Sequence, residues 1–160
     1  MTADLRAIKL LALDVDGTLT DGGLHYGPQG VSQVFSAKDG NGVMKLLEAG
    51  IQVAFVSYRD FRSTRNRAAD LGVELLCLGS SDKAASVRDL ASHLQISTTE
   101  ILFMGDDEKD LPAMKTAGIS ACPSDAAEPV KEFCTLKASL PGGRGAVREI
   151  ADLLLEALDG

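Results

Sequence analysis

Two aspartates one position apart follow the first apolar run of the chain. Asp14 and Asp16 stand in the stretch LLALDVDGTLTDGG, residues 10–23, directly after four apolar residues. Side chains at positions i and i+2 of an extended chain point to the same side, so these carboxylates should lie close together. Such a pair is unfavourable unless a cation or a shared proton compensates for the repulsion. The spacing indicates a cation site or a catalytic carboxylate pair; the alternative is one turn-capping and one solvated aspartate.

A second acidic cluster favours the cation site. Asp106, Asp107 and Asp110 follow the apolar run ILFM in the stretch GDDEKD. Ligands of open α/β sheets bind at the carboxyl ends of the strands, where both clusters are expected. Carboxylates without histidine or cysteine favour Mg²⁺ over zinc. We interpret Asp110 as an N-cap of the following helix in preference to a metal ligand.

The elements that must position these residues alternate along the chain. Continuous apolar runs are typical of strands covered on both faces, and helical patterns separate them. This alternation predicts an α/β fold with a doubly wound, Rossmann-like parallel sheet flanked by helices. Strands are expected at 9–14, 51–57, 73–79, 100–106, 119–123 and 134–139, and helices at 41–49, 60–71, 82–94, 110–117 and 145–158.

One segment interrupts the alternation. Residues 22–37 are expected to form a β-hairpin flap around a turn at Gly27–Gly30. Its apolar side chains either pack on the parent domain or meet another subunit, and the pattern leaves both possibilities open. These side chains are Leu24, Tyr26, Val31, Val34 and Phe35.

Composition limits the class of protein. At 160 residues, with 45% hydrophobic and 24% charged residues, the chain is expected to be one globular domain, 1–160. A net charge of −7 argues against nucleic-acid and anionic-membrane partners. The scattered cysteines Cys77, Cys122 and Cys134 indicate a reducing compartment. No long apolar segment precedes Asp14, so we expect neither a signal peptide nor a membrane span, and a cytoplasmic location.

The motifs together resemble a known family. DVDGT is similar to the DxDGT nucleophile motif of the haloacid dehalogenase superfamily, whose phosphatases use an aspartyl-phosphate intermediate and Mg²⁺. The four motifs of the superfamily can be followed in order along the chain. They match Asp14 with Asp16, then Ser57, then Lys83, and then Asp106 with Asp107.

The resemblance implies a role for each matched residue. Asp14 would attack phosphorus, and Asp16 would protonate the departing sugar oxygen and then deprotonate water. Mg²⁺ would be held by Asp14, the backbone carbonyl of Asp16, and Asp106. Ser57 and Lys83 would neutralise the phosphate oxygens in the transition state.

Short segments between the motifs narrow the resemblance to phosphatases without a cap domain. This group is typified by 3-deoxy-D-manno-octulosonate 8-phosphate (KDO 8-phosphate) phosphatase and shares the stretches at 38–43, 70–72 and 142–149. These relatives are homotetramers whose hairpins pack at the centre, which favours the subunit-contact interpretation of the flap. The resemblance implies a substrate contact from Arg59, and further substrate contacts from residues that could reach the site of a neighbouring subunit: Lys38, Asp39, Gly40 and Arg144.

Several of these assignments keep an alternative. Arg144 could lie at the surface, and Arg59 could form an ion pair at a helix start instead of holding a substrate carboxylate. Asp107 would add an outer contact at the metal site or orient Lys83.

Tyr58 departs from the family, in which glycine usually follows the motif II hydroxyl, here Ser57. It could narrow the pocket, change the sugar accepted or reduce activity.

The resemblance therefore implies an enzyme, a Mg²⁺-dependent phosphatase acting on a small anionic sugar phosphate. The expected substrate is KDO 8-phosphate, which the enzyme would hydrolyse to KDO and inorganic phosphate. One alternative is a nine-carbon, sialic-acid-like 9-phosphate (of KDN or N-acetylneuraminate). Another is a non-catalytic oligomerisation module related to the C-terminal domains of acylneuraminate cytidylyltransferases. A phosphotransferase is disfavoured because no cap would exclude water.

Overall fold

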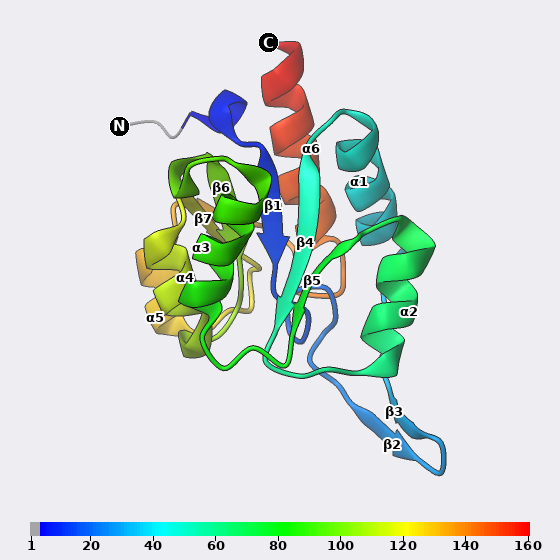
Figure 1. Ribbon diagram of the computed structural model, residues 1–160. Helices are drawn as coiled ribbons and strands as arrows, with labels where there is room; N and C mark the ends of the chain where they lie inside the picture. Colours follow the sequence, from blue (N-terminus) through cyan, green and yellow to red (C-terminus); the bar gives the residue numbers. More distant parts are fainter. Residues whose placement is uncertain (1–3) are drawn as a thin grey trace.

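A parallel six-stranded sheet forms the centre of the computed structural model, which describes residues 4–160 (Figure 1). The strand order β5-β4-β1-β6-β7-β8 places β1 between β4 and β6. Leu13 of β1 pairs with Phe55 of β4 and Met104 of β6, so these three strands end at similar levels. The doubly wound sheet is confirmed. Its strands are β1 Leu10–Leu13, β4 Gln52–Ser57, β5 Leu75–Leu78, β6 Ile101–Met104, β7 Ile119–Cys122 and β8 Leu136–Lys137.

Helices cover both faces of the sheet (Figure 1). Leu11 and Leu13 of β1 join the core beneath α1, α2 and α6, whereas Leu10 and Ala12 join the core beneath α3, α4 and α5. Strand side chains alternate between faces, so both faces must be apolar. The α-helices are α1 Ala37–Glu48, α2 Arg62–Leu71, α3 Lys83–Leu94, α4 Leu111–Thr116, α5 Glu128–Phe133 and α6 Ala146–Asp159. Short 3-10 helices are η1 Leu5–Ala7, η2 Thr98–Glu100 and η3 Glu108–Asp110.

Two helices differ from the sequence-based expectation. Helix α1 begins at Ala37 and not at residue 41, because Ser36 caps it by accepting a hydrogen bond from the Asp39 amide at 3.5 Å. Helix α5 was not predicted. It has six residues and carries Pro129 in its first turn, so it is too short to give a clear helical period.

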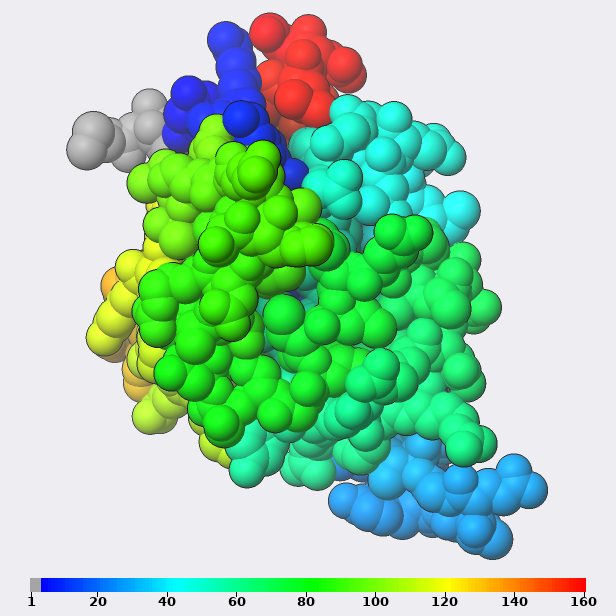
Figure 2. Space-filling model, viewed as in Figure 1, coloured from blue at the N-terminus to red at the C-terminus, as the bar shows by residue number. Residues whose placement is uncertain are grey.

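The predicted hairpin is confirmed and stands out from the body of the molecule (Figures 1 and 2). Strands β2 His25–Gly27 and β3 Gly30–Ser32 pair antiparallel. Tyr26 is 77% and Val34 is 72% exposed, whereas Phe35 packs against the core. The apolar residues of the hairpin therefore divide between the parent domain and the surface.

Among residues 4–160, no helix is long and apolar enough to span a membrane.

Candidate active site

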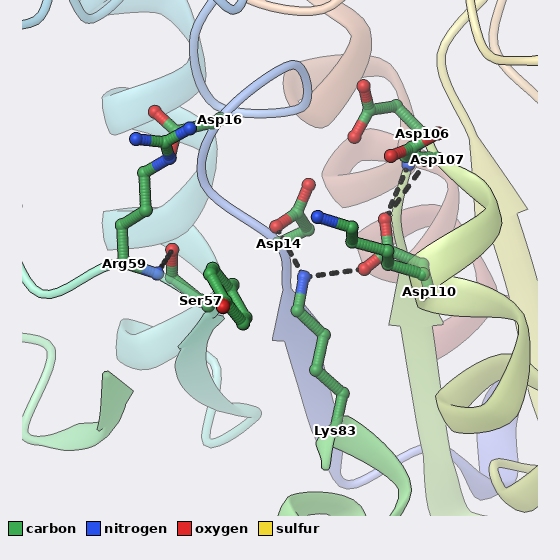
Figure 3. Close-up of a pocket in the computed structure, with 10 residues that line it drawn as sticks. Asp14, Asp16, Ser57, Arg59, Lys83, Asp106, Asp107 and Asp110 are labelled. Carbon is green, nitrogen blue, oxygen red and sulfur yellow. Dashed lines mark hydrogen bonds and ion pairs between the residues drawn. The ribbon is translucent and has the colours of Figure 1, made fainter. Parts of the chain in front are cut away.

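A buried lysine joins two carboxylates at the carboxyl edge of the sheet (Figure 3). The Nζ atom of Lys83 donates to Oδ1 of Asp14 at 2.8 Å and to Oδ1 of Asp110 at 2.6 Å. Asp14 follows β1, Lys83 begins α3 and Asp110 ends η3. Burial opposes the charge on Lys83, but Asp14 and Asp110 outweigh it and raise the pKa of the ammonium group. Lys83 therefore stays cationic at physiological pH.

Three carboxylates at this position form a set suited to a metal ion. One oxygen from each of Asp14, Asp106 and Asp110 lies within 4.8 Å of the other two. Oδ1 of Asp106 is buried and lacks a hydrogen-bond partner among the described residues. Burial and the neighbouring Asp110 raise the pKa of Asp14, and burial also raises that of Asp106. When all three are ionised, these carboxylates exceed the single ammonium of Lys83 by two negative charges, which a divalent cation would balance, so the set fits Mg²⁺.

Asp110 has a different role from the one expected. It stands at the N-cap position of α4 but makes no side-chain capping bond to that helix. Its Oδ2 atom instead accepts the backbone N–H groups of Asp106 at 3.0 Å and Asp107 at 3.2 Å. Of the two roles considered for Asp107, the contact with Lys83 is made by Asp110 instead.

A pocket of about 190 Å³ brings the predicted motifs together. Ser57, the last residue of β4, is buried there, and its Oγ atom accepts the Arg59 amide at 3.2 Å. The helix-start ion pair considered for Arg59 is made by Asp60 and Arg65 instead, at 2.7 Å. The lining residues are Asp14, Asp16, Ser57, Tyr58, Arg59, Lys83, Asp106, Asp107, Lys109 and Asp110.

Comparison with known proteins identifies the family. The family model of haloacid dehalogenase-like hydrolases matches residues 76–139. The KDO 8-phosphate phosphatase KdsC of Haemophilus influenzae is 40% identical over 158 residues, covering 98% of this chain and 88% of that protein. The chain belongs to this phosphatase family. KdsC of Escherichia coli K12 is 38% identical over 151 residues, 94% of this chain and 80% of that protein.

Solved structures of this phosphatase family have the same fold. The cobalt-bound form of the Haemophilus influenzae enzyme superposes with a TM-score of 0.94 at 40% identity, covering 98% of this chain and 92% of that one. The Moraxella catarrhalis enzyme in complex with magnesium ion, phosphate ion and KDO gives 0.94 at 32% identity, covering 98% and 90%. This chain is therefore a phosphoric monoester hydrolase with the haloacid dehalogenase fold.

In this phosphatase the hairpin holds Asp16. The Nε2 atom of Gln33, directly after β3, donates to Oδ1 of Asp16 at 2.7 Å. Its Oε1 atom accepts hydrogen bonds from the hydroxyls of Ser63 at 2.6 Å and Thr64 at 2.8 Å, both in α2. The hairpin and α2 together fix the direction of the Asp16 carboxylate. Sequence reasoning missed Gln33, because a lone amide in a flap belongs to no motif.

Close packing of glycines shapes the turn after Asp14. Gly17 has φ +90°, and a Cβ atom there would collide with the carboxylate of Asp106. The loop at 142–145 packs on the same turn, where Gly143 donates its amide to the Thr18 carbonyl at 3.1 Å. Arg144 is exposed, lies 4.0 Å from Asp21 and does not line the phosphatase pocket. The structure therefore does not bring Arg144 into the pocket of its own chain.

The predicted contacts at 38–40 also lie away from that pocket. Lys38, Asp39 and Gly40 form the first turn of α1. Oδ1 of the buried Asp39 accepts the Arg148 amide at 3.0 Å, at the start of α6. Because the N-cap residue Gly145 has no side chain, Asp39 supplies the acceptor that this helix end needs. In the phosphatase this segment connects α1 to α6.

Proposed function

We propose that this phosphatase hydrolyses KDO 8-phosphate to KDO and inorganic phosphate, through an aspartyl-phosphate intermediate on Asp14. The observation that carries the proposal is the contact of Lys83 with Asp14 beside the carboxylate of Asp106 in one pocket. The identity of 40% to a KDO 8-phosphate phosphatase over 98% of the chain supports the substrate.

The contacts of Asp14 support its role as the nucleophile. Lys83 donates to its Oδ1 atom, and the Thr18 hydroxyl donates to Oδ2 at 3.4 Å, so the carboxylate is held at both oxygens. Attack on phosphorus forms a mixed anhydride and splits one difficult displacement into two easier ones. Lys83 and Ser57 would donate to the phosphoryl oxygens, where charge develops in the transition state.

Asp16 would carry the proton in both steps. It would protonate the departing sugar oxygen and then take a proton from the water that attacks the anhydride. Mg²⁺, when bound by Asp14, the Asp16 carbonyl and Asp106, would screen the repulsion between nucleophile and phosphate. Asp107 lines the same pocket and would support the ligands of that ion.

The substrate is tested by comparing specificity constants. We expect kcat/KM to be highest for KDO 8-phosphate, followed by N-acetylneuraminate 9-phosphate. A higher value for the nine-carbon substrate would replace KDO 8-phosphate with the sialic-acid alternative. No release from either substrate, by folded protein that binds Mg²⁺, would favour the non-catalytic module.

We further propose that four copies assemble through their hairpins. The exposed Tyr26 and Val34 on a projecting hairpin support this assembly. The segment at 38–40 and Arg144 would then be candidates for contact with a neighbouring site. Light scattering should give the mass of a tetramer, and a monomer would contradict the proposal.

We also propose a cytoplasmic location. Three cysteines free of disulfides support it: Cys77, Cys122 and Cys134.

A further inference from the structure

Two side chains from opposite sides of the pocket meet at its rim. Tyr58 follows β4, and Lys109 lies in η3 after β6; these strands flank β1, which precedes Asp14. The Nζ atom of Lys109 is 4.9 Å from the centroid of the Tyr58 ring, which is a cation–π contact. Both residues line the pocket and both are exposed. The pair therefore bridges the two loops that stand on either side of Asp14.

The charge of Lys109 is uncompensated. Lys83 is paired with Asp14 and Asp110, but within residues 4–160 no carboxylate lies at ion-pair distance from Lys109. An aromatic face attracts an ammonium group without neutralising its charge. Lys109 is therefore held in place and remains able to bind an anion. The described part of the chain also gives Arg59, on the same rim, no carboxylate partner.

The position of the Lys109 ammonium matters because aspartates outnumber cations in the pocket. The lining includes five aspartates, so an anionic group is unfavourable wherever no cation faces it. Lys83, at the floor of the pocket, would provide the cation for the phosphate of a substrate. A second anionic group on the same substrate requires a second cation, and Lys109 supplies one at the rim.

We infer that Lys109, held by the ring of Tyr58, binds a carboxylate on the sugar part of the substrate and selects acidic sugar phosphates over neutral ones. This inference rests on the proposed function and deepens it. The ring, which is 58% exposed, also offers a flat face on which the sugar can pack. Tyr58 is then a specificity-determining residue and not an obstruction.

The test compares an acidic and a neutral substrate. kcat/KM is measured for KDO 8-phosphate and for glucose 6-phosphate in the wild type and in Lys109→Gln. Loss of one charge-assisted contact is expected to lower the ratio of the two values about tenfold. Lys115→Gln is the matched control, because its Nζ atom is 5.9 Å from the ring of Phe133, outside the pocket, and it should keep the ratio.

Variants of Tyr58 test the role of the ring. Tyr58→Phe keeps the aromatic face and should keep the wild-type preference, whereas Tyr58→Ala should lose part of it. A Lys109→Gln enzyme with the wild-type ratio would overturn the inference and leave the proposed function intact. An equal fall in kcat/KM for both substrates would also overturn it, because Lys109 would then order the loop without distinguishing the two sugars. A wild type without preference for the acidic sugar would overturn the proposed function and this inference together.

Discussion

Asp110 lies 2.6 Å from the ammonium nitrogen of Lys83, closer than Asp14 does at 2.8 Å. The other oxygen of Asp110 accepts the backbone N–H groups of Asp106 and Asp107. One carboxylate thus fixes both the lysine that contacts Asp14 and the loop that carries Asp106. Asp110 is the structural connection between Lys83 and the loop of Asp106 and Asp107.

Asp110→Ala should lower stability. It leaves two backbone N–H groups without their acceptor and removes one of the two carboxylate partners of the buried Lys83 ammonium, although relief of the repulsion with Asp14 offsets part of the loss. We expect the free energy of unfolding to fall by about 1–2 kcal/mol. Urea unfolding measures it, with the exposed Asp107→Ala as the control. A variant as stable as the wild type would show that Asp110 does not hold this loop.

Gly17→Ala should damage the metal site specifically. Gly17 and Gly50 both have φ +90°, but only at Gly17 would a Cβ atom collide with Asp106; at Gly50 it would meet open space. Both alanine variants should lose about 1–2 kcal/mol from backbone strain. Only Gly17→Ala should also weaken Mg²⁺ binding, because its Cβ atom would displace the Asp106 carboxylate. We expect a loss of at least about 1.4 kcal/mol of binding free energy, which is a tenfold loss of affinity. Calorimetric titration with Mg²⁺ compares them, and equal affinities would contradict the assignment.

Gln33→Ala should impair proton transfer by Asp16. Without its amide partner the Asp16 carboxylate is no longer held in one direction, and we expect kcat/KM for a sugar phosphate, which reports the step in which the leaving group departs, to fall about tenfold, part of the usual effect of a general acid. kcat/KM for p-nitrophenyl phosphate should fall much less, because its leaving group needs no proton in that first step. Gln29→Ala, in the hairpin turn, is the control. An equal fall for both substrates would show that Gln33 does not act through Asp16.

Asp39→Asn should change how stability depends on pH. Burial raises the pKa of Asp39, so the folded state holds this proton more tightly than the unfolded state does. The charged Asp39 therefore lowers the free energy of unfolding above the folded pKa. This effect disappears as the pH falls below the ordinary pKa of 3.8. Asparagine does not titrate. The variant should therefore gain stability relative to the wild type at neutral pH and lose that gain in acid, as measured by thermal unfolding from pH 7 to pH 3.5. A difference that does not vary with pH would contradict the burial effect on Asp39.

The residues at the ends of regular elements could be predicted from the sequence. Ser57 ends an apolar strand, Asp14 and Asp106 follow apolar strands, and parallel strands bring their carboxyl ends to one edge. Lys83 was expected near a helix start and begins α3. The sheet and the pocket that gathers these side chains follow from the same alternation of strands and helices.

The features that could not be predicted from the sequence depend on contacts between residues far apart in the chain. The contacts of Asp110 with Lys83 and of Gln33 with Asp16 span 27 and 17 residues, and no local pattern marks them. The start of α1 was missed because Gly40 and Gly42 lower helix propensity. Packing against α6 overrides that preference, and a Cβ atom at Gly42 would crowd Arg148.

In the proposed mechanism Asp14 forms a phosphoryl intermediate in a Mg²⁺-dependent reaction. The most direct measurement is phosphate release from KDO 8-phosphate by the wild type and by Asp14→Asn, each with Mg²⁺ and with EDTA. Release is expected only from the wild type with Mg²⁺. Sustained release by the folded Asp14→Asn protein, or by the wild type in EDTA, would contradict it.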